Sequence, residues 1–385
     1  MSKRPTVLIA ALVVAVAAIA LTESHDRHPR TLPLSRLASA RRDAGGKTVL
    51  LLWPAGPPEF GDLPGGRPGT TVNVDDLSTG RHAVKRIPGI APGDFPVPLL
   101  SVGRRLVYNS NRGVAAIRDN LTGHPRVLGQ ATFFAPSATP DQIWLVHANH
   151  SSGRPVSIQS ASVSVGRRGR ELALPPRTAG VIAGSAAGIL LVARSGELEL
   201  WRPGRPPRML AHLGVPLEGA GFASDARLVA YGSGCRIEEA TSGFPRTPVG
   251  YEACRTLNVI DLATRRRLAF PAPPRTAGWV PDGFGVETAI SPDDRMLAAA
   301  AALVPARKGK TRLFVLRLAH NSKPTPVPTS TARLYARTAW SPDGAWLFYQ
   351  GPGARLRARE TATGRTSPLP VRCCQYTAMV AIRSR

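Results

Sequence analysis

The chain has 385 residues, of which 43% are hydrophobic and 19% charged, a composition typical of a globular protein that excludes an intrinsically disordered one. Glycine and proline occur 37 times each, which excludes long uninterrupted helices and favours many short strands joined by turns. The formal net charge is +25, and 44 of the 50 basic residues are arginine. This excess indicates either a surface that binds polyanions or a basic surface scattered by compositional bias.

The first segment of the chain has the layout of an export signal. The basic stretch SKRP precedes an uncharged apolar run, Val7–Leu21, and Ala18-Ile19-Ala20 fits a cleavage site. The run is slightly shorter than the ~20 residues of a membrane-spanning helix. Residues 1–22 are therefore expected to be either a signal peptide or an N-terminal anchor inserted through residues 6–22. Residues 23–45 are expected to form a linker, and the rest of the chain is predicted to be extracytoplasmic, either secreted or anchored to the cytoplasmic membrane.

Export makes the four cysteines informative, because an even number in an oxidising compartment favours disulfides. Cys235 and Cys254 flank a stretch with Gly and Pro that is expected to be a long loop between two strands, and a disulfide between them is favoured over two free thiols. Cys373 and Cys374 are adjacent, so they form either a vicinal disulfide or a pair of thiols. No second Cys or His pair stands at ligand spacing, so no metal site is predicted.

A strand-forming segment recurs seven times, and the interval between the first apolar residues of successive copies runs from 37 to 68 residues. The best copies begin with Ser-Pro-Asp, and weaker ones keep mainly the apolar strand. In chain order they are GGKTVLLLW (45–53), VGRRLVYNS (102–110), TPDQIWLVHA (139–148), SAAGILLVAR (185–194), SDARLVAYGS (224–233), SPDDRMLAAA (291–300) and SPDGAWLFYQ (341–350). Asp293, Asp343 and Gly344 of the best copies are expected to shape turns rather than to catalyse.

A second turn pattern, an acidic residue or Asn followed by Thr and usually Gly, lies downstream of the first. It occurs in VDDLSTGRHAV (74–84), RDNLTGHPRVL (118–128), VIDLATRRRLA (259–269) and ARETATGRTSPL (358–369). Gly80, Gly123 and Gly364 are expected to supply the positive φ of a tight hairpin, whereas Arg265 stands at that position in one copy. These turns are predicted to join the last two strands of each repeat.

A period of about 40–50 residues with four short strands is typical of β-propeller blades. One blade cannot bury both its faces, so blades stack until the ring closes. The sequence therefore predicts an all-β fold, a seven-bladed β-propeller over residues 46–385, with six or eight blades as alternatives. The first repeat lacks a preceding strand, and residues 376–382 lack a following hairpin. We expect residues 376–382 to supply the missing inner strand and close the ring.

The motif SPDG, followed by an aliphatic-aromatic strand and then by D-x-x-T-G, resembles the WD-like repeats of exported TolB-type propellers. The resemblance covers about residues 44–385. It implies the fold but says little about activity, because propellers host many unrelated functions.

The motifs of nucleophilic, phosphate-binding and metal chemistry are not found in the sequence. G-x-S-x-G and a Gly-rich phosphate loop are missing, and His147 and His150 are expected to be surface or loop residues. The predicted innermost strands carry only two acidic residues, Glu218 and Glu287. We therefore expect no catalytic residue, metal or cofactor. A propeller hydrolase or lactonase with a site in the central channel is the alternative.

Four arginine clusters lie near predicted turns: GRRGR (166–170), RPGRPPR (202–208), RRR (265–267) and ARLRAR (354–359). Turns of one type gather on one face of a ring, so the first three clusters predict an anion-binding rim, with ordinary solvated turns as the alternative. The residues of this rim are Arg167, Arg168, Arg170, Arg202, Arg205, Arg208, Arg265, Arg266 and Arg267. The predicted function is a monomeric, non-enzymatic envelope scaffold that binds an envelope protein or an anionic wall or lipid component. Export argues against nucleic acid.

Overall fold

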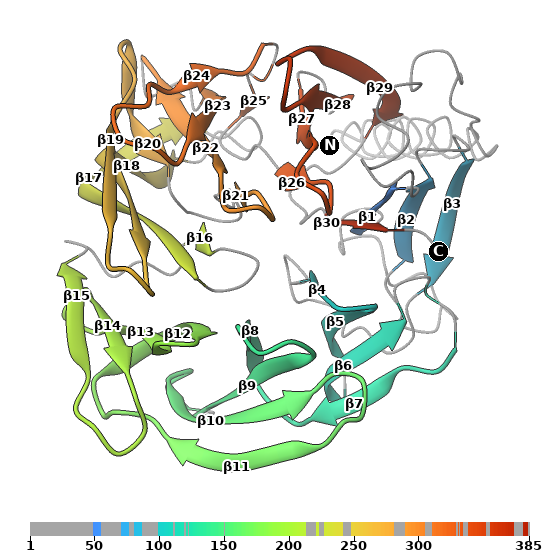
Figure 1. Cartoon of the computed structure of the whole chain (residues 1–385), viewed down its shortest axis with the longest axis vertical. Coiled ribbons are helices and arrows are strands. Elements are labelled where there is room, and N and C mark those ends of the chain that lie inside the picture. The colour runs from blue at the N-terminus through green and yellow to red at the C-terminus, as the bar shows by residue number, and fades with distance from the viewer. Residues whose placement is uncertain are drawn as a thin grey trace, which may run out of the picture.

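Small antiparallel sheets arranged around a central axis make up the protein, as the computed structural model in Figure 1 shows. The residues that the structure describes are 49–54, 71–76, 81–86, 99–110, 112–118, 121, 123–149, 151–212, 221–222, 227–241, 248–280, 289–304, 310–328, 330, 332–333, 338–351, 355–372 and 380–383. Within these ranges every regular element is a strand, and no helix is long and apolar enough to cross a membrane. The predicted signal or anchor segment and the linker lie outside them.

Four of the sheets consist of four strands that follow one another both in the chain and from the ring centre outward (Figure 1). The first is β4 (Leu99–Val102), β5 (Arg105–Ser110), β6 (Gly113–Arg118) and β7 (Arg126–Gly129), and the second is β8 (Phe133–Pro136), β9 (Gln142–Ala148), β10 (Pro155–Ser162) and β11 (Arg168–Ala173). The third is β12 (Thr178–Ser185), β13 (Gly188–Ala193), β14 (Glu197–Trp201) and β15 (Arg208–His212), and the fourth is β26 (Thr338–Trp340), β27 (Trp346–Gln350), β28 (Arg355–Glu360) and β29 (Thr366–Arg372). The predicted all-β β-propeller is confirmed.

A fifth four-stranded sheet joins the two ends of the described chain. Its order is β30 (Val380–Arg383), β1 (Val49–Pro54), β2 (Thr71–Asp76) and β3 (Arg81–Arg86). β30 lies antiparallel to β1, with pairs from Val49 with Arg383 to Leu52 with Val380. The first four residues of the predicted closing strand, 376–379, lie outside the described residues. The sheet is completed only when segments more than three hundred residues apart in the sequence meet.

The remaining strands form one ten-stranded sheet. Its elements are β16 (Gly221–Phe222), β17 (Leu228–Thr241), β18 (Pro248–Asp261), β19 (Arg267–Pro271), β20 (Thr276–Val280), β21 (Ala289–Ile290), β22 (Met296–Leu303), β23 (Lys310–Arg317), β24 (Thr325–Pro326) and β25 (Ala332–Arg333). β20 pairs with both β18 and β22, and thereby links the group β16–β19 to the group β21–β25. The count of seven blades stays a prediction, because it requires these two groups to be treated as separate blades.

The segment between Cys235 and Cys254 is not the long loop that its glycine and proline content suggested. β17 and β18 stay in register from the Leu228–Asp261 pair, through the two cysteines, to the Thr241–Pro248 pair. The glycines and prolines of this segment are gathered between residues 243 and 250, and the run RIEEAT before them is free of both. Strand pairing therefore continues almost to the tip of the hairpin, and the prediction of a loop was wrong.

The hydrophobic core is divided into clusters that lie between neighbouring sheets. On β13, Ile189 and Leu191 pack into the cluster shared with β8–β10, whereas Leu190 and Val192 pack into the cluster shared with β17 and β18. Successive side chains of a strand point to opposite faces of its sheet, so β13 is buried on both sides. This explains why strands such as β13 read as continuous apolar runs rather than as alternating patterns.

Several of the innermost strands touch their neighbours around the axis. β30 contacts β26 and β4, β21 contacts β16 and β26, and β8 contacts β12. The contact between β8 and β12 includes a hydrogen bond from the amide of Ala138, just beyond β8, to the carbonyl of Gly184 at 2.6 Å. The strands that line the axis therefore hold adjacent sheets together in addition to the apolar cores.

Removing residues 376–385 should abolish the stable fold, because β1 would lose one of its two partners and present an unpaired edge to solvent. We expect the truncated chain to lose its cooperative thermal transition and to aggregate, as followed by circular dichroism and light scattering. A chain that lacks only residues 384–385 retains all of β30 and serves as the control. An unchanged melting temperature in the longer truncation would contradict the closing role of β30.

Candidate anion-binding face

The strands of each sheet alternate in direction, so turns between the first and second strands and turns between the third and fourth strands lie on the same face of the ring. We call the former inner turns, the latter outer turns, and the surface that they share the arginine face. Its described inner turns are residues 103–104, 137–141, 186–187, 291–295 and 341–345, together with Arg227 before β17. Its described outer turns are residues 121 and 123–125, 163–167, 202–207, 262–266, 318–324 and 361–365.

The two Ser-Pro-Asp inner turns have the same hydrogen bonds. Ser341 Oγ donates to Asp343 Oδ1 at 2.5 Å and accepts from the amide of Trp346 at 2.9 Å. Ser291 Oγ makes the same pair of bonds, to Asp293 Oδ1 at 2.5 Å and from the amide of Met296 at 2.9 Å. Each aspartate therefore lies within the hydrogen bonding of its own turn. Gly344 adopts a φ of +70° there.

The outer turns use a residue with positive φ at the position where the sequence pattern places Gly. Gly123 has a φ of +83° and Gly364 a φ of +71°, whereas Arg265 adopts +62° at the equivalent position. The amides of Arg265 and Gly364 donate to the carbonyls of Asp261 and Glu360, at 2.7 and 2.9 Å respectively, so the two turns close in the same way. Gly80 lies outside the described residues.

Four of the described outer turns are each bound to the inner turn of the same group of strands by one recurring backbone bond. The amide directly after the third strand donates to the carbonyl of the residue directly before the second strand. The four bonds are Val163 to Asp141 (2.8 Å), Leu262 to Arg227 (2.9 Å), Leu318 to Arg295 (2.8 Å) and Thr361 to Ala345 (2.8 Å). These bonds fix each of the four outer turns relative to its own inner turn, whereas residues 202–207 are connected to theirs by the Arg202 side chain.

Side-chain hydrogen bonds reinforce two of these connections. The acceptors are the carboxylates of Asp141 and Asp261. Asp141 accepts from Ser162 Oγ at 2.7 Å and from the amide of Ser164 at 2.9 Å. Partial burial alone would raise the pKa of Asp141, but the bonds from Ser164 and Ser162 and the charge of Arg105 outweigh it and hold the pKa below its usual value.

Asp261 is paired with Arg227 across the same kind of junction. Arg227 donates to Asp261 Oδ2 through Nη2 at 2.8 Å and through Nε at 3.2 Å, and the amides of Ala263 and Thr264 donate to Asp261 Oδ1 at 2.9 and 3.0 Å. Burial would raise the pKa of Asp261, yet these bonds and the charge of Arg227 lower it. Arg227 Nη1 also lies 3.9 Å from Asp294 Oδ2 in the neighbouring inner turn.

The nine arginines of the predicted rim lie on three outer hairpins that follow one another around the ring: β10–β11, β14–β15 and β18–β19 (Figure 1). The side chains of all nine are exposed. Arg202 Nε donates to the carbonyl of Ala187 at 2.6 Å, and Arg267 Nη2 donates to the carbonyl of Leu210 in the adjacent sheet at 2.6 Å. Among the described residues, none of the nine forms a salt bridge with an acidic side chain.

The carboxylates and the guanidinium groups of this face thus have different environments. Asp141, Asp261, Asp293 and Asp343 take part in the hydrogen bonding of the turns. The nine arginines are exposed, and two of them, Arg202 and Arg267, donate to neutral backbone carbonyls. The result is an arc of positive charge that the nearby carboxylates do not neutralise. Arginines presented in this way can bind phosphate or carboxylate groups in a bidentate manner.

The fourth arginine cluster does not belong to this arc. Arg355, Arg357 and Arg359 alternate along β28, a third strand, so their predicted position in a connecting turn was wrong. Arg359 is half-buried, and burial lowers its pKa. Leucine and alanine at the intervening positions 356 and 358 are buried, which shows that the run ARLRAR is a two-sided strand pattern.

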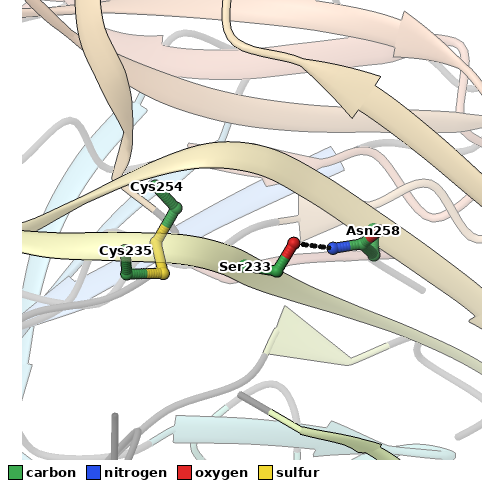
Figure 2. The surroundings of a disulfide bond; sticks show 4 residues. All are labelled: Ser233, Cys235, Cys254 and Asn258. Atoms are coloured by element: carbon green, nitrogen blue, oxygen red, sulfur yellow. Dashed lines mark hydrogen bonds between the residues drawn. A yellow bond between two sulfur atoms is a disulfide. The ribbon is translucent and has the colours of Figure 1, made fainter. Parts of the chain in front are cut away.

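Other predicted site residues are dispersed. Cys235 and Cys254 form a disulfide between β17 and β18 (Figure 2). His147 lies half-buried in β9. Cys373, Cys374, Glu218, Glu287 and His150 lie outside the described residues. The sequence did not predict that Arg227 pairs with Asp261. Arg227 directly precedes the apolar strand of the copy SDARLVAYGS (224–233), and this position marks it as a turn residue.

No family model matches the sequence, and neither does any curated protein. Among solved structures, the chain is similar to the β-propeller domain of Myceliophteria thermophila Cps50 (Swd1), at 12% identity over 74% of this chain and 88% of that one, with a TM-score of 0.44. It is also similar to apo AztD from Citrobacter koseri, at 12% identity over 92% and 89% of the two chains (TM-score 0.42), and to KlAtg21 in its complex with the coiled coil of AgAtg16, at 14% identity over 71% and 83% (TM-score 0.45). These similarities say nothing about what this chain binds.

Arg265→Gly should stabilise the protein, because a residue with a Cβ pays about 1–2 kcal/mol in the left-handed region. The greater flexibility of Gly in the unfolded chain offsets about 0.5–1 kcal/mol of that gain. We expect the free energy of unfolding in urea to rise by about 0.5–1 kcal/mol. The reciprocal change, Gly364→Arg at the equivalent position, should lower it by a similar amount, and equal stabilities for all three proteins would refute the equivalence.

Asp261→Asn should lower the free energy of unfolding at neutral pH by about 1–3 kcal/mol, because the charged bonds to Arg227 are lost. The folded-state pKa of Asp261 is lowered, so its contribution is present above the unfolded-state pKa and disappears as the pH falls through the folded-state value. Urea unfolding at descending pH should therefore show wild type and variant converging in acid. Arg227→Gln is the second variant of a double-mutant cycle with Asp261→Asn. If the cycle gave no interaction free energy between the two residues, the ion pair would be refuted.

Proposed function

We propose that this propeller is a non-enzymatic binding scaffold of the cell envelope, located outside the cytoplasm, whose arginine face binds an anionic lipid surface. The observation that carries the proposal is the arc of nine exposed arginines on three consecutive outer hairpins, with no salt bridge to an acidic side chain among the described residues. A rigid, unneutralised arc suits a partner that presents many negative groups at once.

Two exposed apolar side chains among these arginines favour lipid over a wall polymer. Val165, in the outer turn before β11, is 71% exposed, and Met209, directly after Arg208, is 62% exposed. Arginine next to exposed aliphatic side chains is the combination that binds membrane interfaces, where the charge meets headgroups and the apolar atoms enter the acyl boundary. A hydrophilic polymer would offer nothing to these apolar groups.

The predicted location supports the same partner. The apolar run Val7–Leu21 is the sequence feature of an export signal or anchor, and the Cys235–Cys254 disulfide suits an oxidising compartment. If residues 6–22 are retained in the membrane, they raise the effective concentration of the propeller at its surface. Weak contacts by the arginine face would then be enough to orient the ring on the bilayer.

The proposal is tested by vesicle sedimentation with chains that begin at residue 23, so that the apolar run contributes no binding. Three variants each convert one cluster to glutamine: Arg167, Arg168 and Arg170; Arg202, Arg205 and Arg208; Arg265, Arg266 and Arg267. At about 1 kcal/mol for each arginine near an anionic surface, each variant should lose roughly a hundredfold in affinity for phosphatidylglycerol vesicles at low salt. Binding should also weaken as salt is raised.

The matched control converts Arg154, Arg177 and Arg194 to glutamine, which removes the same charge from exposed residues at the opposite ends of neighbouring strands. This control should retain nearly the wild-type affinity, and phosphatidylcholine vesicles should not bind any of the proteins. An equal loss of affinity in the control would show that only the net charge matters. That result would contradict binding through the arginine face. If the protein bound soluble polyphosphate but not vesicles, the partner of the arginine face would be an anionic wall polymer and not a lipid surface.

A further inference from the structure

The two cysteines of the β17–β18 hairpin have an acidic neighbour that the sequence spacing did not reveal. Cys235 and Cys254 are directly opposite each other in the antiparallel pair, and Glu252 is opposite Ile237. Glu252 precedes Cys254 by two residues, so both side chains are on the same face of β18. A carboxylate oxygen of Glu252 and the two Sγ atoms all lie within 4.8 Å of one another.

The surroundings hold this group of side chains in place. Cys254 is completely buried and packs in the same core cluster as Trp279, its partner across β20. Cys235 and Glu252 are half-buried. Close to the cysteines on the same two strands, Asn258 Nδ2 donates to Ser233 Oγ at 2.8 Å (Figure 2). Paired residues on both sides of the cysteines therefore fix the backbone from which all three side chains extend.

We propose that this hairpin is a two-state site: a disulfide when oxidised, and a Cys₂Glu site for a zinc-class divalent cation when reduced. A dithiol reduces the disulfide by two electrons and becomes a disulfide itself, leaving the thiols of Cys235 and Cys254. The cation then displaces the two thiol protons and binds two thiolates and the Glu252 carboxylate. The inference is independent of the proposed lipid binding.

The donor set and its geometry fit such a cation. Thiolate sulfur and carboxylate oxygen are both ligands of Zn²⁺, and three protein ligands leave one of the four tetrahedral positions for water. With Zn–S bonds of about 2.3 Å, tetrahedral binding separates the two sulfur atoms by roughly 3.7 Å. The Cα atoms of Cys235 and Cys254 are 3.8 Å apart, so once the disulfide is reduced, rotation of the two side chains brings both sulfur atoms within reach of one cation.

The proposed site does not have the sequence spacing of a typical metal motif. Structural zinc sites are sought as pairs of Cys or His close in sequence. Here the ligands are brought together by strand register: one comes from β17 and two from β18, and the third ligand is a glutamate. The sequence therefore predicted the cysteine pair and its disulfide, but not the chelating face that the hairpin creates.

The test uses the full chain with Cys373→Ser and Cys374→Ser, so that only the hairpin cysteines can supply thiolates. The protein is reduced with dithiothreitol, freed of reductant by anaerobic gel filtration and titrated with Co²⁺ as the probe. We expect a thiolate-to-cobalt charge-transfer band and the visible bands of tetrahedral cobalt, at one ion per chain, and their loss when Zn²⁺ is added. The oxidised protein should show none of these bands.

Glu252→Gln should weaken Co²⁺ binding by at least about tenfold, because the loss of even an outer-shell partner of a metal costs that much. Glu252→Asp keeps the carboxylate and should retain part of the affinity, and circular dichroism of each reduced protein without metal shows that it is folded. If the folded, reduced protein gave no charge-transfer band, the metal site would be refuted. Equal affinity in wild type and Glu252→Gln would likewise remove Glu252 from the site.

Discussion

Burial of both sheet faces, as seen for β13, is the constraint on which the rest of this structure depends. Strands such as β13 carry apolar side chains on both sides, and each side enters a different core cluster. A sheet with two apolar faces is stable only between two neighbours, and a row of such sheets has exposed ends unless it closes on itself. The ring, the pairing of β30 with β1 and the contacts among innermost strands all follow from this requirement.

The fold class was accessible from the sequence because local signals repeat. Ser291 and Ser341 begin turns with the same bonds, and that recurrence was visible as the repeated motif Ser-Pro-Asp. Pairing between distant segments was accessible only for ring closure, where the first repeat lacked an inner strand and the last segment supplied one. Gly and Pro near the tip of the β17–β18 hairpin favour a loop by composition, whereas strand pairing continues almost to the tip. No local sequence pattern predicts that β20 pairs with two different strands. Register, not composition, decides such cases.

The candidate face was partly accessible for the same reason. Three arginine clusters fall on outer hairpins, as their proximity to turn signals predicted, whereas ARLRAR has the two-residue alternation of a strand and forms β28. The sequence also could not show that Asp141 accepts hydrogen bonds from Ser162 and Ser164, or that Asp261 accepts them from Arg227. That difference in partners, rather than the total charge of +25, leaves the rim arginines unneutralised. The same turns therefore stabilise the ring and create its charged surface.

The pairing of β30 with β1 has a consequence for the order of events during folding. Neighbouring hairpins can form as soon as they are synthesised, since their contacts are local, but this pair must close a loop of more than three hundred residues. Until β30 is available, the earliest strands can only be part of an incomplete arc with exposed apolar faces. Chaperones that hold the growing chain would therefore be needed longest for the segment that is made first.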